Sequence, residues 1–315
     1  MKRLTVCPSC GGRSFRPYSF TPEGERTKSL HYSQSHCTQC DLVFSDPVAE
    51  PAELEAFYNS VYYEEIENVY HARRPDLKTL VQKRVEETAR GLSGMVLPYV
   101  PSGVFFEIGT GHGAVLEAAR RLGFDVAGVE PSQSAAIFGQ EVLGLSKLRH
   151  GIFCAGDWPE AFCDVVYSHH VIEHVPDLNG FLQGINRILK PGGLVVVGTE
   201  NHRNSWVPYR KVRSWLKGRW LPEFQTADHH TFYFSDRSLC YALEHAGFEI
   251  LKVLVYSPSL EDKLAVSRFR SIFSKAFFYW LHYSEVWSGR GNRLLVWCRK
   301  PASRIKHQAA CETDP

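Results

Sequence analysis

Residues 104–113 read Val-Phe-Phe-Glu-Ile-Gly-Thr-Gly-His-Gly. The first five form a continuous apolar run with one acid near its end, which is the pattern of a buried parallel strand. Three glycines at alternate positions follow, and the chain then enters a helical stretch from Ala114 to Leu122. A glycine turn between a strand and a helix lets a ligand approach the backbone and points free N–H groups of the helix at it. The stretch therefore predicts an α/β domain with a ligand at this turn.

A second acid lies where a nucleotide-like cofactor would need one. The next predicted strand covers residues 125–129 and ends at Glu130-Pro131, about 20 residues after Gly109, where a carboxylate can accept hydrogen bonds from both ribose hydroxyls. The cofactor could then be a nicotinamide dinucleotide or S-adenosylmethionine (SAM). Glu107 stands two residues before the first glycine, where it suits the ammonium group of a methionine moiety and would repel a pyrophosphate. The sequence favours SAM.

Further strand ends carry the rest of the expected site. Residues 153–158 are predicted to end a third strand, so that Asp157 could accept a hydrogen bond from an adenine amino group and Trp158 could cover the ring. A core position is the alternative for Trp158. A fourth strand is predicted over 162–168, and a turn at 189–193 leads into a strand over 194–198. Ligands bind at the carboxyl ends of such strands. The predicted cofactor-binding residues are Glu107, Gly109, Thr110, Gly111, Gly113, Glu130, Pro131, Asp157, Trp158, Ser168 and His169.

Two Cys-x-x-Cys pairs stand near the start of the chain. Cys7 and Cys10 form the first pair, and Cys37 and Cys40 form the second. Four thiolates at two tight turns suit a tetrahedral, structural zinc ion. About 45 residues are too few for an independent core, so metal binding, on the order of 10 kcal/mol, would supply the folding free energy. A redox pair and four ordinary buried cysteines are the alternatives.

The composition excludes some classes of function. The chain has 315 residues, of which 44% are apolar, and a net charge of only +2, which argues against a strongly basic nucleic-acid binder. The first residues form no apolar run and no long apolar stretch follows, so we expect neither a signal peptide nor a spanning helix. Nine cysteines without an export signal indicate a reducing, cytoplasmic location.

These residues together resemble the class I SAM-dependent methyltransferases over about 104–200. Within that class they resemble the ubiquinone-pathway O-methyltransferases and the methyltransferases of sugar and cell-surface polysaccharide biosynthesis. Among the latter, some deoxysugar C-methyltransferases also begin with a four-cysteine zinc module. The resemblance implies a Rossmann-like sheet of seven strands with helices on both faces and an antiparallel last strand. Residues 248–256 and 293–298 fit the sixth and seventh strands.

The resemblance also indicates a catalytic base. Residues 228–235 resemble a segment in which a histidine is followed by aromatic residues and a serine, and His230 matches that histidine. We expect His230 to take a proton from the acceptor, with His229, His169 and His170 as alternatives. Packing or hydrogen bonding is the competing interpretation for each of them.

The sequence also predicts how the chain is divided. We expect a four-cysteine zinc module over 1–48, a helical connector over 49–100 with helices at 52–58 and 76–97, a methyltransferase domain over 101–300, and a disordered tail over 301–315. Basic and aromatic residues in 203–222 lie within an expected acceptor lid, 203–230, and would bind an anionic acceptor unless they form a solvated helix. The insertion 261–288 could be a buried cap, a dimer contact or a membrane-surface helix.

The expected function is therefore methyl transfer from SAM to an oxygen or carbon atom of a small anionic acceptor. A nucleotide-linked sugar, a polysaccharide or a lipid intermediate would fit this description. Two alternatives remain at this point: an RNA methyltransferase whose zinc module reads RNA, and a SAM-binding protein without catalysis.

Overall fold

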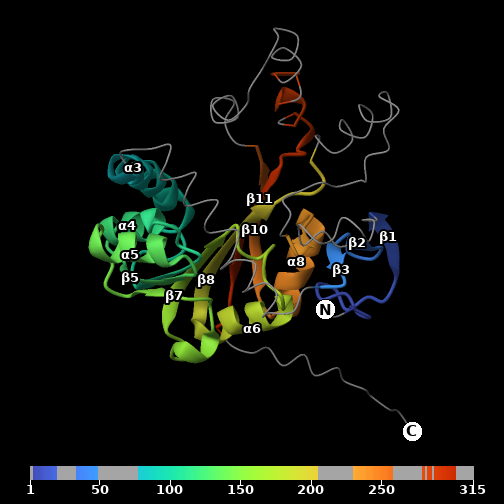
Figure 1. Cartoon of the computed structure of the whole chain (residues 1–315), viewed down its shortest axis with the longest axis horizontal. Helices are drawn as coiled ribbons and strands as arrows, with labels where there is room; N and C mark the ends of the chain where they lie inside the picture. Colours follow the sequence, from blue (N-terminus) through green and yellow to red (C-terminus); the bar gives the residue numbers. More distant parts are fainter. Residues whose placement is uncertain are drawn as a thin grey trace.

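The computed structural model describes residues 3–19, 33–48, 77–204, 230–257, 279–280, 282–285 and 287–302. These residues form a large seven-stranded sheet with helices on both faces, and a small four-stranded sheet beside helix α8 (Figure 1). Several predictions fall outside the described residues: the helix at 52–58, His229, and most of the expected lid, insertion and tail.

The large sheet has the strand order β10-β11-β8-β7-β4-β5-β6. Its strands are β4 (Val104–Ile108), β5 (Asp125–Glu130), β6 (Leu148–His150), β7 (Cys163–His169), β8 (Leu189–Glu200), β10 (Glu249–Tyr256) and β11 (Arg293–Arg299). Strand β11 runs antiparallel to both of its neighbours, while the other pairs are parallel. The predicted seven-stranded sheet with an antiparallel last strand is confirmed.

Helices cover the two faces of this sheet. They are α3 (Leu77–Met95), α4 (Ala114–Arg121), α5 (Gln133–Glu141), α6 (Leu178–Ile188) and α8 (Asp236–His245). Helices α3, α4 and α5 lie on one side and α6 and α8 on the other (Figure 1). Successive strand residues point to opposite faces, so Phe105 joins the core under α3 and α4, while Phe106 joins the core under α6.

Two predicted boundaries are wrong. The third strand is β6, Leu148–His150, and not the residues before Trp158, where the chain instead forms a short 3-10 helix, Ala155–Asp157. The rings of Phe153 and Trp158 pack on Phe106. This packing, and not pairing in a sheet, accounts for the apolar pattern of the segment. Strand β8 already begins at Leu189, and the predicted turn is an irregularity where its pairing with β7 shifts register.

The small sheet has the order β1-β2-β3-β9 and is antiparallel throughout. Its strands are β1 (Phe15–Ser19), β2 (Ser33–Cys37), β3 (Val43–Asp46) and β9 (Phe232–Tyr233). The fourth strand, β9, comes after β8 in the chain and is far in sequence from β1, β2 and β3. The sequence did not indicate that it joins them. Residues of both segments, among them Leu42, Phe44 and Phe232, belong to one continuous core.

Only a few residues of the predicted insertion are described. His282 and Glu285 are buried, whereas Trp280, Tyr283 and Trp287 are 63%, 62% and 91% exposed. The interpretation as a buried cap is therefore wrong for these three aromatic residues. Among the helices that the structure describes, none is both long enough and apolar enough to span a membrane.

Candidate functional site

Two buried acids lie at the carboxyl ends of neighbouring strands. Glu107 belongs to β4 and Glu130 ends β5, and their side chains are almost fully buried. Burial raises the pKa of Glu107 well above its usual value, and the nearby charge of Glu130 raises it further. Its Oε2 atom has no hydrogen-bond partner among the described residues. Because a buried and unpaired carboxylate is costly, this position suits a ligand that brings its own positive charge.

The glycine turn is held in shape by the second acid. Glu130 accepts hydrogen bonds from the backbone N–H of Gly111 at 2.6 Å and of Ser132 at 2.9 Å. Burial raises the pKa of Glu130, although these two bonds oppose the rise. Gly109 has a φ of +75°, and a Cβ atom there would come within 2.5 Å of Val171. The positive φ and the closeness of Val171 together favour glycine at this position.

The predicted adenine residues lie beside this edge. Trp158 is 6% exposed and packs edge-on against Phe106, with ring centroids 4.6 Å apart. The guanidinium group of Arg149 lies 4.1 Å above the Trp158 ring. Asp157 ends the short 3-10 helix, and its backbone oxygen accepts a hydrogen bond from Arg149. Their roles toward adenine remain predictions.

The end of β7 carries the remaining predicted cofactor residues. Ser168 is fully buried, and its hydroxyl has no partner among the described residues. Burial, together with the charges of His170 and Arg293, lowers the pKa of His169 to about 3. A base this weak is poorly matched to proton abstraction near pH 7. The lowered pKa thus counts against His169 as the base, and His230 stays the predicted one.

Three potential ligand groups meet beyond β7. Atoms of Glu173, His174 and His230 lie within 4.8 Å of one another and could hold a metal ion. The rings of His174 and His230 are 4.6 Å apart and nearly perpendicular. Burial raises the pKa of Glu173, but the hydrogen bond from His170, at 2.8 Å, and nearby histidine charges outweigh it and lower the pKa to about 2. Glu173 is therefore ionised and faces histidines.

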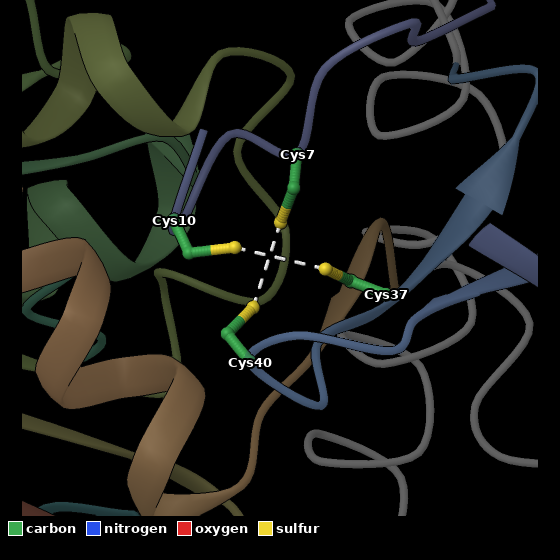
Figure 2. A group of neighbouring side chains, drawn as sticks. All are labelled: Cys7, Cys10, Cys37 and Cys40. Carbon is green, nitrogen blue, oxygen red and sulfur yellow. Dashed lines mark hydrogen bonds between the residues drawn. The ribbon is translucent and has the colours of Figure 1, made fainter. Parts of the chain in front are cut away.

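The four predicted cysteines converge on one point (Figure 2). The Sγ atoms of Cys7 and Cys40 are 3.6 Å apart, as are those of Cys10 and Cys37. A tetrahedral zinc site with Zn–S bonds of about 2.3 Å requires sulfur–sulfur distances of about 3.8 Å. The geometry and the donor set fit a tetrahedral metal ion.

A network of charged side chains joins this module to the large sheet. Asp41 Oδ1 accepts a hydrogen bond from His36 Nε2 at 2.7 Å, and Asp41 Oδ2 contacts His202 and Arg203. Burial raises the pKa of Asp41, but these contacts outweigh it and hold the pKa far below its usual range. Arg16 Nε donates to His36 Nδ1 at 2.8 Å, which extends the network to β1.

This network forms one wall of a cavity of about 670 Å³. The cavity opens at the end of β8, next to the strand that ends in His169. Its lining residues are Arg16, Pro17, Tyr18, His36, Asp41, Asn201, His202, Arg203, Asn204, Asp236, Val255, Gly289 and Arg290. Of these, the sequence analysis singled out only Arg203 for ligand binding. Asp41 follows the second cysteine pair and has a φ of +73°, a turn conformation that Asp tolerates. The sequence does not show that Asp41 contacts the distant residue His202.

Comparisons with known proteins agree with this geometry. The sequence model of the family described as "Methyltransferase domain" matches residues 71–253. A ubiquinone biosynthesis O-methyltransferase of Rhodopseudomonas palustris is 35% identical over 172 residues, which are 51% of this chain and 64% of the relative. The C-methyltransferase NovU of Streptomyces niveus is 28% identical over 231 residues, 69% of this chain and 46% of NovU.

A solved structure was also found to be similar. It is the S-adenosylmethionine-dependent methyltransferase from Mesorhizobium loti, with a TM-score of 0.48 and 19% identity, covering 68% of this chain and 99% of that one. The family match covers more than half of the chain, and the seven-stranded sheet, its glycine turn and its two acids fall within or beside that match. The chain therefore belongs to the methyltransferase-domain family, and its fold is that of the class I SAM-dependent methyltransferases.

Proposed function

We propose that the chain transfers a methyl group from SAM to an oxygen or carbon atom of a small anionic acceptor. A nucleotide-linked sugar is the favoured example. The observation that carries this proposal is the cavity at the end of β8, which is lined by Arg16, Arg203 and Arg290. Its volume lies within the range of about 300–1,000 Å³ that small-molecule sites occupy.

Three arginines and two aspartates, Asp41 and Asp236, line the cavity, and this excess of positive charge favours an anion. Arg203 is already paired with Asp41. The guanidinium of Arg16 donates to the His36 ring rather than to a carboxylate. Guanidinium groups bind phosphate oxygens in a bidentate manner, which gives both affinity and orientation. A diphosphate in this cavity would place the rest of the acceptor toward the ends of β7 and β8.

The proposed mechanism assigns each side of the site one task. Glu107 would hold the methionine ammonium group of the cofactor, and Glu130 would hold its ribose hydroxyls. The cofactor supplies a methyl group that is already electrophilic, so the protein must mainly align the acceptor and exclude water, which can be worth roughly 7–11 kcal/mol. His230 takes the proton of the acceptor, and the ionised Glu173 beside it favours the protonated imidazole that results.

We also propose that Cys7, Cys10, Cys37 and Cys40 bind a structural zinc ion. All four positions of a tetrahedral site would be filled by protein sulfur, which leaves no open position for a substrate. Metal analysis of the purified chain should give about one zinc per chain, and replacing Cys37 with Ser should abolish it.

The acceptor proposal is tested with methyl-labelled SAM and four acceptor classes: nucleotide-linked sugars, lipid diphosphates, neutral catechols and RNA. We expect transfer to a diphosphate-bearing acceptor. Arg16→Gln and Arg290→Gln should raise its KM about tenfold or more and leave the Kd for SAM unchanged. Arg149→Gln, which lies at the Trp158 edge, is the matched control. Transfer to a neutral catechol alone would overturn the anionic class but not the methyltransferase activity.

A lipid-linked acceptor is a second candidate. It is favoured by the exposed aromatic side chains Trp280, Tyr283 and Trp287. Such side chains have an apolar body and a polar tip, which suits a membrane–water interface. Cosedimentation with phosphatidylglycerol-containing vesicles should then fall in a Trp280→Ala/Trp287→Ala variant but not in Ile152→Ala, a control that is 62% exposed. No binding by the unchanged protein would exclude this candidate.

A further inference from the structure

The segment that carries His230 is held between two parts of the chain. On one side, the carbonyl oxygen of Glu173 accepts hydrogen bonds from the N–H groups of Thr231 at 2.8 Å and Phe232 at 3.0 Å. On the other side lies β3 of the cysteine module: Ser45 N–H donates to the Thr231 carbonyl at 2.9 Å, and Ser45 Oγ donates to the His230 carbonyl at 3.1 Å. The module thus supplies one hydrogen bond to the backbone of the candidate base and one to the backbone of the next residue.

Strand β3 is in turn a continuation of the second cysteine pair. Cys37 N–H donates to the Leu42 carbonyl at 2.8 Å, and Asp41 N–H donates to the Cys37 carbonyl at 3.0 Å, so the turn and the strand form one unit. Leu42 and Phe44 are fully buried in the same core as the cysteines and as the β9 residue Phe232. Because the module is small, its order depends on the metal that the four thiolates hold.

The backbone of the glycine turn is bonded by a different element. Gly109 N–H donates to the Val129 carbonyl at 2.9 Å, and Gly111 N–H donates to Glu130, so these bonds of the glycine turn come from β5. The module instead contacts the other side of the site, through Ser45, Asp41 and Ser9, whose hydroxyl donates to the Ser238 carbonyl at 2.6 Å. Loss of the module should therefore affect the two sides differently.

We propose that the four-cysteine module is the positioning element of the candidate base. Metal bound by the cysteines fixes β3, and β3, with Ser45 as its positioning residue, fixes His230 against His174. Metal loading is thereby coupled to the acceptor side of the site and not to the cofactor side. This inference concerns the position of His230 and holds for any acceptor.

Hydrogen–deuterium exchange of the full chain tests the coupling without an acceptor. The zinc-loaded protein is compared with the same protein after chelation, and SAM binding is measured by calorimetry in parallel. We expect exchange to rise on the order of tenfold or more in residues 41–46 and 230–234, while residues 104–113 and the Kd for SAM stay unchanged. Unchanged protection of 230–234 would overturn the proposal, and so would equal loss of protection in 104–113.

A single-atom change tests the positioning residue while the metal site stays intact. Ser45→Ala removes only the hydroxyl that bonds to the His230 carbonyl, and should speed exchange in 230–234 about fivefold. Ser45→Thr keeps a hydroxyl and should restore the slow exchange. Ser35→Ala is the matched control, because its hydroxyl bonds to Asp46 within the module. Equal effects of Ser45→Ala and Ser35→Ala on 230–234 would contradict the role of Ser45.

Discussion

Buried acids on the two sides of the site are stabilised in opposite ways. On the cofactor side, burial raises the pKa values of Glu107 and Glu130, and one oxygen of Glu107 has no partner among the described residues. On the module side, Asp41 and Glu173 are also buried, but contacts with histidines and, at Asp41, with an arginine lower their pKa values. One oxygen each of Asp41 and Glu173 also lacks a hydrogen bond among the described residues, so the direction of the pKa shift is what separates the two sides. A raised pKa marks a carboxylate that suits a cationic ligand, and a lowered pKa marks one that already has favourable partners in the chain.

The largest effect should follow from breaking the paired acid that joins the module to the sheet. Asn also tolerates the positive φ of residue 41, so Asp41→Asn should keep the backbone conformation. It removes the negative charge that His36, His202 and Arg203 contact. We expect the free energy of unfolding to fall by about 3–5 kcal/mol, as when one partner of a buried pair is removed. Urea denaturation of the zinc-loaded protein measures it.

The matched control for that variant is Asp125→Asn. Asp125 forms an ion pair with Lys147 in which both side chains are 54% exposed, and such pairs contribute about 0–1 kcal/mol. Similar losses in the two variants would mean that the Asp41 network does not stabilise the fold beyond an ordinary surface pair.

Glu107→Gln should separate binding from stability. Without the charge, the methionine ammonium group loses its partner, and we expect the Kd for SAM to rise about 10- to 100-fold. The ligand-free protein should become more stable at pH 8, since the variant no longer buries an unpaired carboxylate. Calorimetry and thermal unfolding measure the two quantities. A variant that loses both SAM affinity and stability would show that Glu107 supports the fold.

The dependence of stability on pH should also differ between the two sides. The raised pKa of Glu107 means that the folded state holds a proton more tightly than the unfolded state, so stability falls as pH rises above about 4.3 toward that raised value. The lowered pKa of Glu173, about 2, has the opposite sign: its contribution is present above about 4.3 and is lost as pH falls toward 2.

Denaturation of the ligand-free protein between pH 3 and pH 8 tests both signs. Each group changes stability by at most about 1.4 kcal/mol per pH unit. Glu107→Gln should flatten the alkaline side of the curve and leave the acid side unchanged, and Glu173→Gln should do the reverse. If Glu107→Gln alters stability only on the acid side of the curve, the pKa of Glu107 is lowered in the folded protein, and the carboxylate already has a favourable partner.

The smallest effect should come from Arg149→Ala. Arg149 lies on the ring of a tryptophan that is itself in the core, so its removal costs about 0.5–1 kcal/mol of stability. We expect the Kd for SAM to change less than threefold. A larger change in affinity at equal stability would indicate that Arg149 and Trp158 together cover the adenine.

The cofactor side could be predicted from the sequence because its residues follow one another along two neighbouring strands. Glu107, the glycine turn and Glu130 each stand in a short pattern, and parallel strands bring their carboxyl ends together. The four cysteines could also be predicted, because each Cys-x-x-Cys pair is itself a short pattern. The third strand was misplaced because the apolar residues around Trp158 indicate burial but not the type of element. Aromatic residues that flank a 3-10 turn can be buried as well as residues of a strand.

The module side could be predicted only in part. The histidine segment was recognised, but its pairing with β3 was not, since neither strand carries a pattern that specifies a partner so far away. The same holds for the bond between His202 and Asp41. Short strands of two to four residues leave too few alternating positions to set a register from sequence alone.

The pairing of β3 with β9 has a consequence for the making of this protein. Ser45 and His230 are 185 positions apart, so during synthesis the outer edge of β3 is completed only after five of the seven strands of the large sheet, β4 to β8, have been made. Until then the nascent module presents unpaired backbone groups, the kind of edge on which chains aggregate. Truncated products that end before β9 should therefore be the aggregation-prone species in cells that express this chain.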